Sequence, residues 1–479
     1  MEKKEYDAVV VGAGPNGLAA AITLQRHGLS VLLLEAAPTV GGGMRSGPLT
    51  LPGFTHDICS AIHPLAVASP FFESLDLGKF GLQFIQPGFA AAHPFDDGTA
   101  AVLQGSPEET ASGLGADRES YLSFVKGLSA DWPSLKNDVL APLHFPADPA
   151  AFAAFGWKGF PSAEWQARRF SGDHARGLWA GMATHAMLPL SFAATSAVGL
   201  VLLLAGHHKG WPLAKGGSQS IADALAACFV AGGGEIATSI TVRSLKDIPS
   251  ARAVLFDTNP ASLLQIAGHR FSPVYRWQLD RYRYGMGVFK IDWALSGPIP
   301  FTNARCREAG TVHLGNTLEE IAAGEQQCWD GQHPEKPFVL LAQPSNFDST
   351  RAPAGKYTAW AYCHVPNGSV KDMTTAIEQQ VSRFAPGFRD LILARHTMNT
   401  QQMEHYNPNY LGGDINGGSL ELSQLFTRPA LRFSPYRTSA KGIYLCSSST
   451  PPGGGVHGMC GFHAAKTALD DIFNIHVTG

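Results

Sequence analysis

A run of glycines near the N-terminus has the spacing of a phosphate-binding loop. Gly12, Gly14 and Gly17 form the pattern GxGxxG directly after the apolar residues 8–11. Such glycines allow a tight turn and close approach to a pyrophosphate, and a helix that begins there offers free N–H groups and a positive dipole end. Glu35 follows about twenty residues later, where an acid binds ribose hydroxyls. These residues predict recognition of a dinucleotide, through Gly12, Gly14, Pro15, Asn16, Gly17, Glu35 and Ala36.

A βαβ unit must hold these residues in place. Residues 8–11 are β-branched or small and predict a buried parallel strand. The next helix is expected to end at His27 and Gly28, since glycine suits a left-handed cap. A second strand over residues 30–34 then delivers Glu35. A lone GxGxxG is a weak signal, but this order of elements predicts a Rossmann-like α/β domain.

A second glycine cluster, Gly41 to Gly43, is followed by Arg45 and Ser46. A fold that binds only NAD needs neither these glycines nor the cation. Here the chain resembles the FAD-containing amine oxidase and phytoene desaturase superfamily, whose first motif is followed by a GG-x-x-R-S/T-like element. The resemblance implies FAD as cofactor, with Gly42, Gly43 and Arg45 around its diphosphate and ribityl chain. One extra glycine leaves open which glycine has which role, and the alternative for Arg45 is a solvated surface residue.

A third glycine run lies near the C-terminus, in the segment KGIYLCSSSTPPGGGVHGMCGF. We expect a short strand over residues 443–446 and a helix over residues 457–473. The segment resembles the ending of phytoene desaturase-type proteins, with Ser447 in place of the usual glycine after Cys446. The resemblance implies that the run lies against the isoalloxazine ring, where a positive helix end stabilises the charge of the reduced ring. The residues concerned are Gly454, Gly455, Val456 and His457.

Three side chains are candidates for catalysis. His457 is the titratable group of the final glycine run, and acid/base chemistry and packing over the ring edge both stay open for it. Lys290 shares one face of a predicted strand with Asp292. The resemblance to amine oxidases implies a lysine–water contact near the flavin, whereas the alternative is a solvent-facing Lys–Asp pair. Asp414 stands among the glycines of residues 405–426, as a functional carboxylate or as part of a plain turn.

The remaining chain is expected to form two domains. Residues 232–245 predict a glycine turn and a strand that carries Ile236, Ile240 and Val242, and the resemblance implies that Val242 touches the adenine. The FAD-binding domain is therefore discontinuous, over residues 1–75, 215–270 and 435–479. An α+β substrate-binding domain on a mixed or antiparallel sheet is expected over residues 76–214 and 271–434.

Composition limits the partners. Only 16 % of residues are charged and 45 % are hydrophobic, which indicates large buried surfaces and a mainly hydrophobic small-molecule substrate. A net charge of −3 offers no electrostatic case for nucleic acid. The seven cysteines never form CxxC, so they predict free thiols, and no metal site is expected. Since no signal-peptide pattern follows the N-terminus, we expect a cytoplasmic protein.

One uncharged segment, residues 186–206, has just the length that spans a bilayer. Pro189 and several Ser and Thr residues favour a buried helix that lines the interior. Peripheral contact with a membrane surface is the second interpretation. The sequence also leaves a homodimer open.

The resemblance implies an FAD-dependent oxidoreductase that removes hydride from carbon and forms a C=C or C=N bond. Because no second GxGxxG marks an NAD(P)H domain, O2 or a quinone is expected to reoxidise the flavin. The alternatives are a flavin amine oxidase, a redox-neutral isomerase or saturase that uses reduced FAD, and a non-enzymatic interaction protein that FAD stabilises. Neither GxSxG nor HExxH is present to support hydrolase or metalloprotease chemistry.

Overall fold

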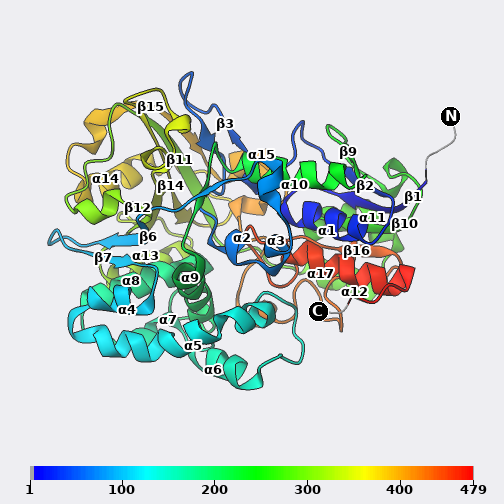
Figure 1. Ribbon diagram of the computed structural model, residues 1–479, viewed down its shortest axis with the longest axis horizontal. Coiled ribbons are helices and arrows are strands. Elements are labelled where there is room, and N and C mark those ends of the chain that lie inside the picture. The colour runs from blue at the N-terminus through cyan, green and yellow to red at the C-terminus, as the bar shows by residue number, and fades with distance from the viewer. Residues whose placement is uncertain (1–4, 478–479) are drawn as a thin grey trace.

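The structure, a computed structural model, describes residues 5–477. Two β-sheets stand side by side along the long axis of the molecule, and a group of helices lies below the larger one (Figure 1). The smaller sheet has five parallel strands in the order β16-β10-β1-β2-β9. Their bounds are β1 Tyr6–Val11, β2 Val31–Leu34, β9 Glu235–Ala237, β10 Ala251–Phe256 and β16 Ile443–Leu445.

The central strand of the parallel sheet is β1, in which Val9 pairs with Val254 on one side and Leu32 on the other. Helices pack on both faces of this sheet because its strands are mainly apolar and bury side chains on both sides. One face carries α1 (Pro15–Arg26), α10 (Gln219–Ala231) and α17 (Met459–Ala468), and the other carries α11 (Pro260–Ala267) and α12 (Pro273–Asp280). The predicted Rossmann-like α/β fold is confirmed. Its strands come from three separated parts of the chain, within residues 6–34, 235–256 and 443–445.

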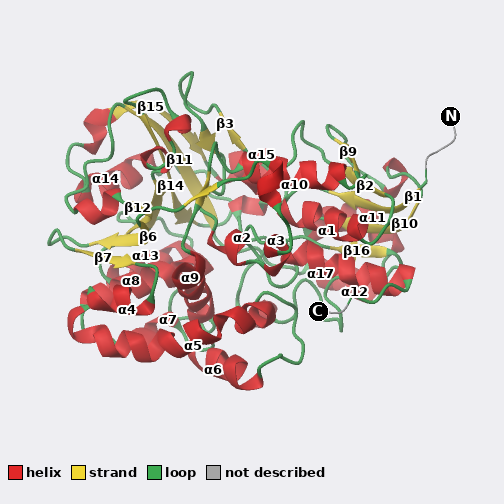
Figure 2. Cartoon of the chain, viewed as in Figure 1, coloured by secondary structure: helices red, strands yellow, loops and turns green. Residues whose placement is uncertain are grey.

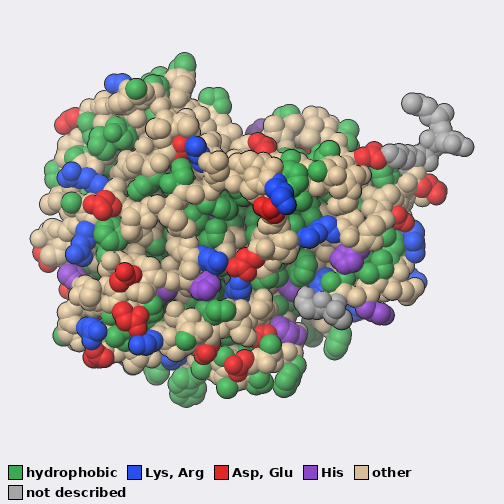
Figure 3. Space-filling model, viewed as in Figure 1, with side chains coloured by type: hydrophobic (Ala, Val, Ile, Leu, Met, Phe, Trp, Pro, Cys, Tyr) green, Lys and Arg blue, Asp and Glu red, His purple; other side chains and the backbone are tan. Residues whose placement is uncertain are grey.

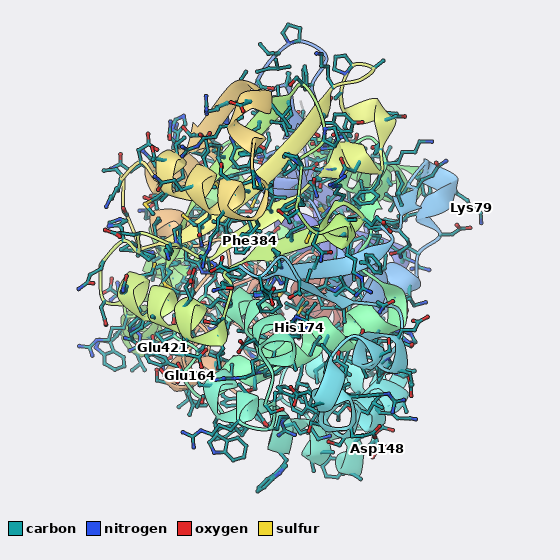
Figure 4. All side chains as sticks on the ribbon, turned by 90° about the vertical axis from the view of Figure 1, so that its left-hand side faces the viewer. Lys79, Asp148, Glu164, His174, Phe384 and Glu421 are labelled. Carbon is teal, nitrogen blue, oxygen red and sulfur yellow. The ribbon has the colours of Figure 1, made fainter. Side chains whose placement is uncertain are left out.

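The larger sheet is mixed, in the order β15-β11-β14-β13-β12-β6-β7, and only β6 and β12 pair in parallel. Phe289, Ile291 and Trp293 of β11 pack against α14 (Thr374–Phe384). Figure 4 shows α14, marked by Phe384, above this sheet and α8, marked by His174, below it. The strands are β6 Phe89–Pro94, β7 Ala100–Leu103, β11 Gly287–Leu295, β12 Ala309–Leu314, β13 Val339–Ala342, β14 Tyr357–Val365 and β15 Ile392–Met398.

A group of helices covers the other face of the mixed sheet (Figure 2). It consists of α4 Pro107–Ser112, α5 Arg118–Val139, α6 Pro149–Gly159, α7 Ala163–Ala167, α8 Asp173–Ala183 and α9 Thr195–Lys209. The single helix expected over residues 186–206 is wrong in its first half. Met187 and Ala194 have positive φ, and helix α9 begins only at Thr195. Within residues 5–477, no helix combines the length and apolar character needed to cross a membrane.

The strand expected over residues 232–245 is also shorter than predicted. Only β9 is extended, because Ser239 adopts a left-handed conformation (φ 59°) and turns the chain. The N–H of Ile240 then donates to the carbonyl of Glu35, and Val242 lies in an irregular segment. Alternating apolar residues therefore continue past the end of the strand here.

The remaining elements are short ribbons and helices outside the two main sheets. Short ribbons pair β3 with β4 and β5 with β8. All seven cysteines are free thiols. The bounds are β3 Ser46–Gly47, β4 His56–Asp57, β5 Phe84–Ile85, β8 Leu213–Ala214, α2 Pro64–Ala68, α3 Pro70–Glu73, α13 Leu318–Trp329, α15 Thr400–Tyr406 and α16 Leu422–Leu425.

Candidate functional site

The glycine loop after β1 packs directly against the end of β10. Gly12 has a φ of 101°, and a Cβ on Gly14 would lie 2.8 Å from Oδ2 of Asp257. A Cβ on Gly17 would overlap the carbonyl oxygen of Gly12. The Gly17 N–H donates to the same Oδ2 of Asp257 at 2.8 Å. The turn and the approach of α1 to β1 thus both require glycine.

Glu35 follows β2 and faces the glycine loop. Its Oε2 accepts the N–H of Ala13 at 2.8 Å, and its Oε1 accepts from Nη2 of Arg45 at 3.0 Å. Arg45 also lies over the ring of Tyr406, and both members of the ion pair are buried. Arg45 is therefore no solvated surface residue. It holds the Glu35 carboxylate beside the loop, where such an acid meets a ribose.

The second glycine cluster crosses the first at backbone contact. Gly42 has a φ of 55°, and a Cβ there would lie 2.9 Å from Cα of Gly14. A Cβ on Gly43 would overlap the hydroxyl of Tyr410, and the hydroxyl of Tyr406 donates to the Gly42 carbonyl at 2.7 Å. These contacts leave no room for side chains where the two loops meet.

The C-terminal glycine run is also held by close contacts within the protein. A Cβ on Gly454 would lie 2.9 Å from Oδ1 of Asn416, and one on Gly455 would lie 2.9 Å from Cδ1 of Leu65. Helix α17 begins at Met459, two residues later than expected, because Gly458 adopts a left-handed conformation. The sequence analysis explained these glycines by contact with a ligand alone. The close approach of Asn416 and Leu65 requires them as well.

His457 is buried between this run and the start of α17. Its Nδ1 accepts the N–H of Met459 at 3.0 Å, and its Nε2 lies 3.1 Å from the carbonyl of Gly453 and donates to it. Burial lowers the pKa of His457 to about 4, so the ring is neutral at pH 7. Because the backbone occupies both ring nitrogens, these bonds favour packing over acid/base chemistry.

One cavity of about 1300 Å³ joins the three glycine runs. Gly17 does not line it and serves the packing of α1 instead. The crossing glycines, the N-terminus of α1 and the Glu35 carboxylate together fit the diphosphate and ribose of a dinucleotide. The predicted cofactor residues along its wall are Gly12, Gly14, Pro15, Asn16, Glu35, Ala36, Gly42, Gly43, Arg45, Val242, Gly454, Gly455, Val456 and His457.

Lys290 lies on β11 and forms an ion pair with Asp292. Both side chains are fully buried, so the expected solvent-facing pair is wrong. Asp292 also lies 3.7 Å from Nδ1 of His56 and of His396. Neither Lys290 nor Asp292 is among the described residues that line the cavity.

Asp414 does not line the cavity; its carboxylate accepts backbone hydrogen bonds that hold its own loop in place. Its carboxylate accepts the N–H groups of Gly285 at 2.7 Å, Asn416 at 2.8 Å and Gly418 at 3.0 Å. Burial raises the pKa of Asp414, although these backbone donors act against the rise. Asn416 lines the cavity and touches Gly454, so Asp414 acts on the site by positioning.

Asp257 and Arg428 are two of the charged residues of the cavity wall that sequence reasoning missed. Asp257 directly follows β10, and burial raises its pKa to about 7. An acid at the end of a strand parallel to β1 was the available signal, since such ends meet at one edge of the sheet. Arg428 is buried and donates to the carbonyls of Ser448 and Ser449, while its Nη1 has no partner in residues 5–477. Nothing in the local sequence of Arg428 indicates this position.

The parallel sheet, the crossing glycine loops and the joined cavity define the class, which is the flavin-type oxidoreductase fold. Residues 10–75 match the family model described as an NAD(P)-binding Rossmann-like domain. Mouse pyridine nucleotide-disulfide oxidoreductase domain-containing protein 2 is 26% identical, and the alignment covers 95% of it and 99% of this chain. One component of the limonene dehydrogenase of Castellaniella defragrans is 21% identical, with 96% of it and 98% of this chain covered. The structure of cyclohexylamine oxidase from Brevibacterium oxydans aligns with a TM-score of 0.59 at 16% identity, with 99% of it and 98% of this chain covered. The predicted resemblance in fold to the flavin amine oxidases is thereby confirmed.

Proposed function

We propose that the protein is an FAD-dependent oxidoreductase that removes a hydride from carbon in a neutral, mainly hydrophobic small molecule. The observation that carries the proposal is the continuity of the cavity. The same space that the glycine runs border extends between the mixed sheet and the helices α6 and α9. A dinucleotide and a second molecule can therefore meet inside it.

The residues that would hold FAD are those of the three glycine runs, with Glu35 at the ribose and Arg45 orienting Glu35. FAD supplies the acceptor for a hydride when it is bound. The buried guanidinium of Arg428 places a fixed positive charge beside the C-terminal glycine run, where Gly453 is its neighbour. Such a charge favours an anion in the adjoining space.

The inner part of the cavity, which we call the chamber, is apolar. Three acids line the whole cavity among the described residues, and two of them, Glu35 and Asp257, belong to the dinucleotide loop. The third, Asp138, accepts from Nε2 of His144 at 2.9 Å and from the N–H of Ala147 at 3.2 Å. Oδ2 of Asp138 has no partner among the described residues, whereas no acid stands among the apolar side chains of the chamber. The apolar side chains of the chamber include Ile62, Leu65, Phe155, Val198, Val201, Leu202, Trp211, Leu340, Trp360 and Tyr362.

This lining supports formation of a C=C bond over oxidation of an amine. The name of the relative limonene dehydrogenase supports the same direction, since limonene carries no amine. Anaerobic mixing of the purified protein with terpenes, polyenes and primary amines tests the choice. We expect apolar substrates to bleach the flavin absorbance and amines to leave it unchanged. Bleaching by NADPH without any effect of these substrates would instead favour a reductive or redox-neutral function.

The mouth of the cavity carries exposed apolar side chains, and we propose that it rests on a lipid surface. Phe433, which is wholly exposed, lines the cavity together with Leu143 and Phe160. Trp157, on α6 next to the lining residue Gly156, is 80 % exposed. Figure 3 shows apolar side chains gathered along the lower edge of the molecule, where α6 lies in Figure 1. Substrate would then enter from the bilayer.

Replacing both Trp157 and Phe433 with serine is expected to weaken binding to phosphatidylcholine vesicles by about tenfold or more, since each loses the burial of a large apolar side chain. Co-sedimentation measures the effect. Trp277→Ser is the matched control, because Trp277 is exposed on α12 away from the cavity. Equal sedimentation of the double variant and the wild type would contradict a lipid-facing mouth.

A further inference from the structure

A pair of histidines at the chamber wall, His185 half-buried on the wall and His313 buried behind it, is not used by the proposed hydride transfer. His185, after α8, lines the cavity, and its Nε2 lies 3.1 Å from Nε2 of His313 on β12. The ring of Trp211 stands edge-on to His185 and fixes its orientation. Burial lowers the pKa of His185 to about 3 and that of His313 well below its usual range, so both rings are neutral at pH 7.

A hydrogen bond between two neutral imidazoles uses the N–H of one ring and the free nitrogen of the other. The surroundings of His313 decide which of the two rings donates. Nδ1 of His313 is buried without a hydrogen-bond partner in residues 5–477. It packs against α8 at Gly181, where a Cβ would lie 2.6 Å from it. A buried N–H without a partner is rarer than an unpaired acceptor. The proton of His313 therefore lies on Nε2 and points to Nε2 of His185, which leaves His185 with an N–H at Nδ1.

Two further polar groups of the chamber wall lack a protein partner among the described residues. The hydroxyl of Thr311 is buried and unpaired, and Thr311 shares a face of β12 with His313. The indole N–H of Trp360, on β14, is also buried and unpaired. The register places Ala342 of β13 between Thr311 and Trp360, so both border one row of the sheet. The indole can only donate a hydrogen bond.

We propose that the substrate carries a neutral oxygen, of a carbonyl or hydroxyl group, which accepts a hydrogen bond from His185 at this end of the chamber. The inference rests on the proposed function, because it assigns a polar group to the hydrophobic substrate. An ammonium group would meet the N–H groups of His185 and Trp360 here, with the Thr311 hydroxyl as a single acceptor beside them. Because both imidazoles are neutral, a carboxylate would find no cation among these groups.

Three probes of one shape test the proposal on the protein as purified. They are 2-decanone, its alkene isostere 2-methyl-1-decene, and 2-aminodecane, with affinity measured from the quenching of tryptophan fluorescence. We expect the ketone to bind about five to ten times more tightly than the alkene, as one net hydrogen bond allows. Tighter binding of the amine than of the ketone would overturn the proposal.

Variants assign the effect to named groups. In His185→Phe the ketone is expected to bind no better than the alkene, whereas the affinity for the alkene stays within about twofold of wild type. Thr311→Val, which removes the hydroxyl at constant shape, should reduce the preference for the ketone about threefold. A preference that persists in both variants would overturn the proposal. Because the measurement needs no turnover, flavin content and bleaching on the same samples test the proposed function separately.

Discussion

Replacing Gly17 with alanine is expected to yield a protein that retains no dinucleotide after dialysis. The new Cβ would overlap the carbonyl oxygen of Gly12, so α1 must move away from β1. That movement also breaks the bond from the Gly17 N–H to Asp257. Forcing a methyl group into such a contact costs about 3 kcal/mol of folding stability, and the displaced helix N-terminus no longer meets the phosphates. Flavin absorbance and thermal unfolding measure the two effects.

A glycine elsewhere provides the matched control for this variant. Gly127 lies exposed in the interior of α5, and a Cβ there meets nothing within 4 Å. Gly127→Ala is expected to raise stability by up to about 1 kcal/mol, since alanine is the better helix former, with flavin content unchanged. A Gly17→Ala protein that holds its flavin as the wild type does would contradict the assigned role of the loop.

Replacing Arg351 with methionine is expected to cost about 3–5 kcal/mol of the free energy of unfolding, because it leaves a buried charge without its partner. Nη2 of Arg351 lies 2.7 Å from Oδ2 of Asp57, and both side chains are about 1 % exposed. Oδ1 of Asp57 accepts from Oγ of Ser46 and from the N–H of Ser218. The pair thus joins the parallel-sheet side of the molecule to the segment after β13. Chemical denaturation measures the loss.

The sign of the pH dependence follows from Asp57. Burial alone raises its pKa, but Arg351 and the hydrogen bond from Ser218 outweigh burial and hold the pKa below its usual range. A depressed pKa in the folded state stabilises the protein above the unfolded-state pKa of about 3.9, and this stability is lost as pH falls through the folded value.

The Arg351→Met variant loses this pH-dependent contribution to the free energy of unfolding. Its loss of stability relative to wild type is therefore largest at neutral pH and becomes smaller in acid. The double variant Asp57→Asn/Arg351→Met removes the charge as well and is expected to be more stable than Arg351→Met alone. If the double variant is no more stable, the ion pair is not the cause of the loss.

The fold and the dinucleotide half of the site were predictable because local rules govern them. The strand, glycine turn, helix and terminal acid are adjacent in sequence, so their spacing identifies Gly12, Gly14 and Glu35 directly. The C-terminal run was assigned instead from its resemblance to phytoene desaturase-type endings. Where a rule depends on tertiary context, prediction failed. Positive φ at Ala194 delays the start of α9, and positive φ at Ser239 follows the end of β9, although the apolar pattern runs through both positions.

The chamber was not predictable from the sequence, because long-range pairing creates it. Lys290 and Asp292 alternate as a solvent-facing pair would, yet both are buried, and His56 of β4 and Trp360 of β14 pack against them. His185 and His313 are 128 residues apart, and neither stands in a motif. Asp257 meets the glycine loop only because β10 pairs with β1 in parallel.

Identification of the nucleotide that denatured, purified protein releases tests the cofactor assignment most directly. Chromatography of the supernatant, with absorbance at flavin and adenine wavelengths, separates FAD from NAD and NADP. We expect about one FAD for each chain, released without proteolysis. A protein that releases no flavin, and that binds NAD or NADP but not added FAD, would contradict the assignment.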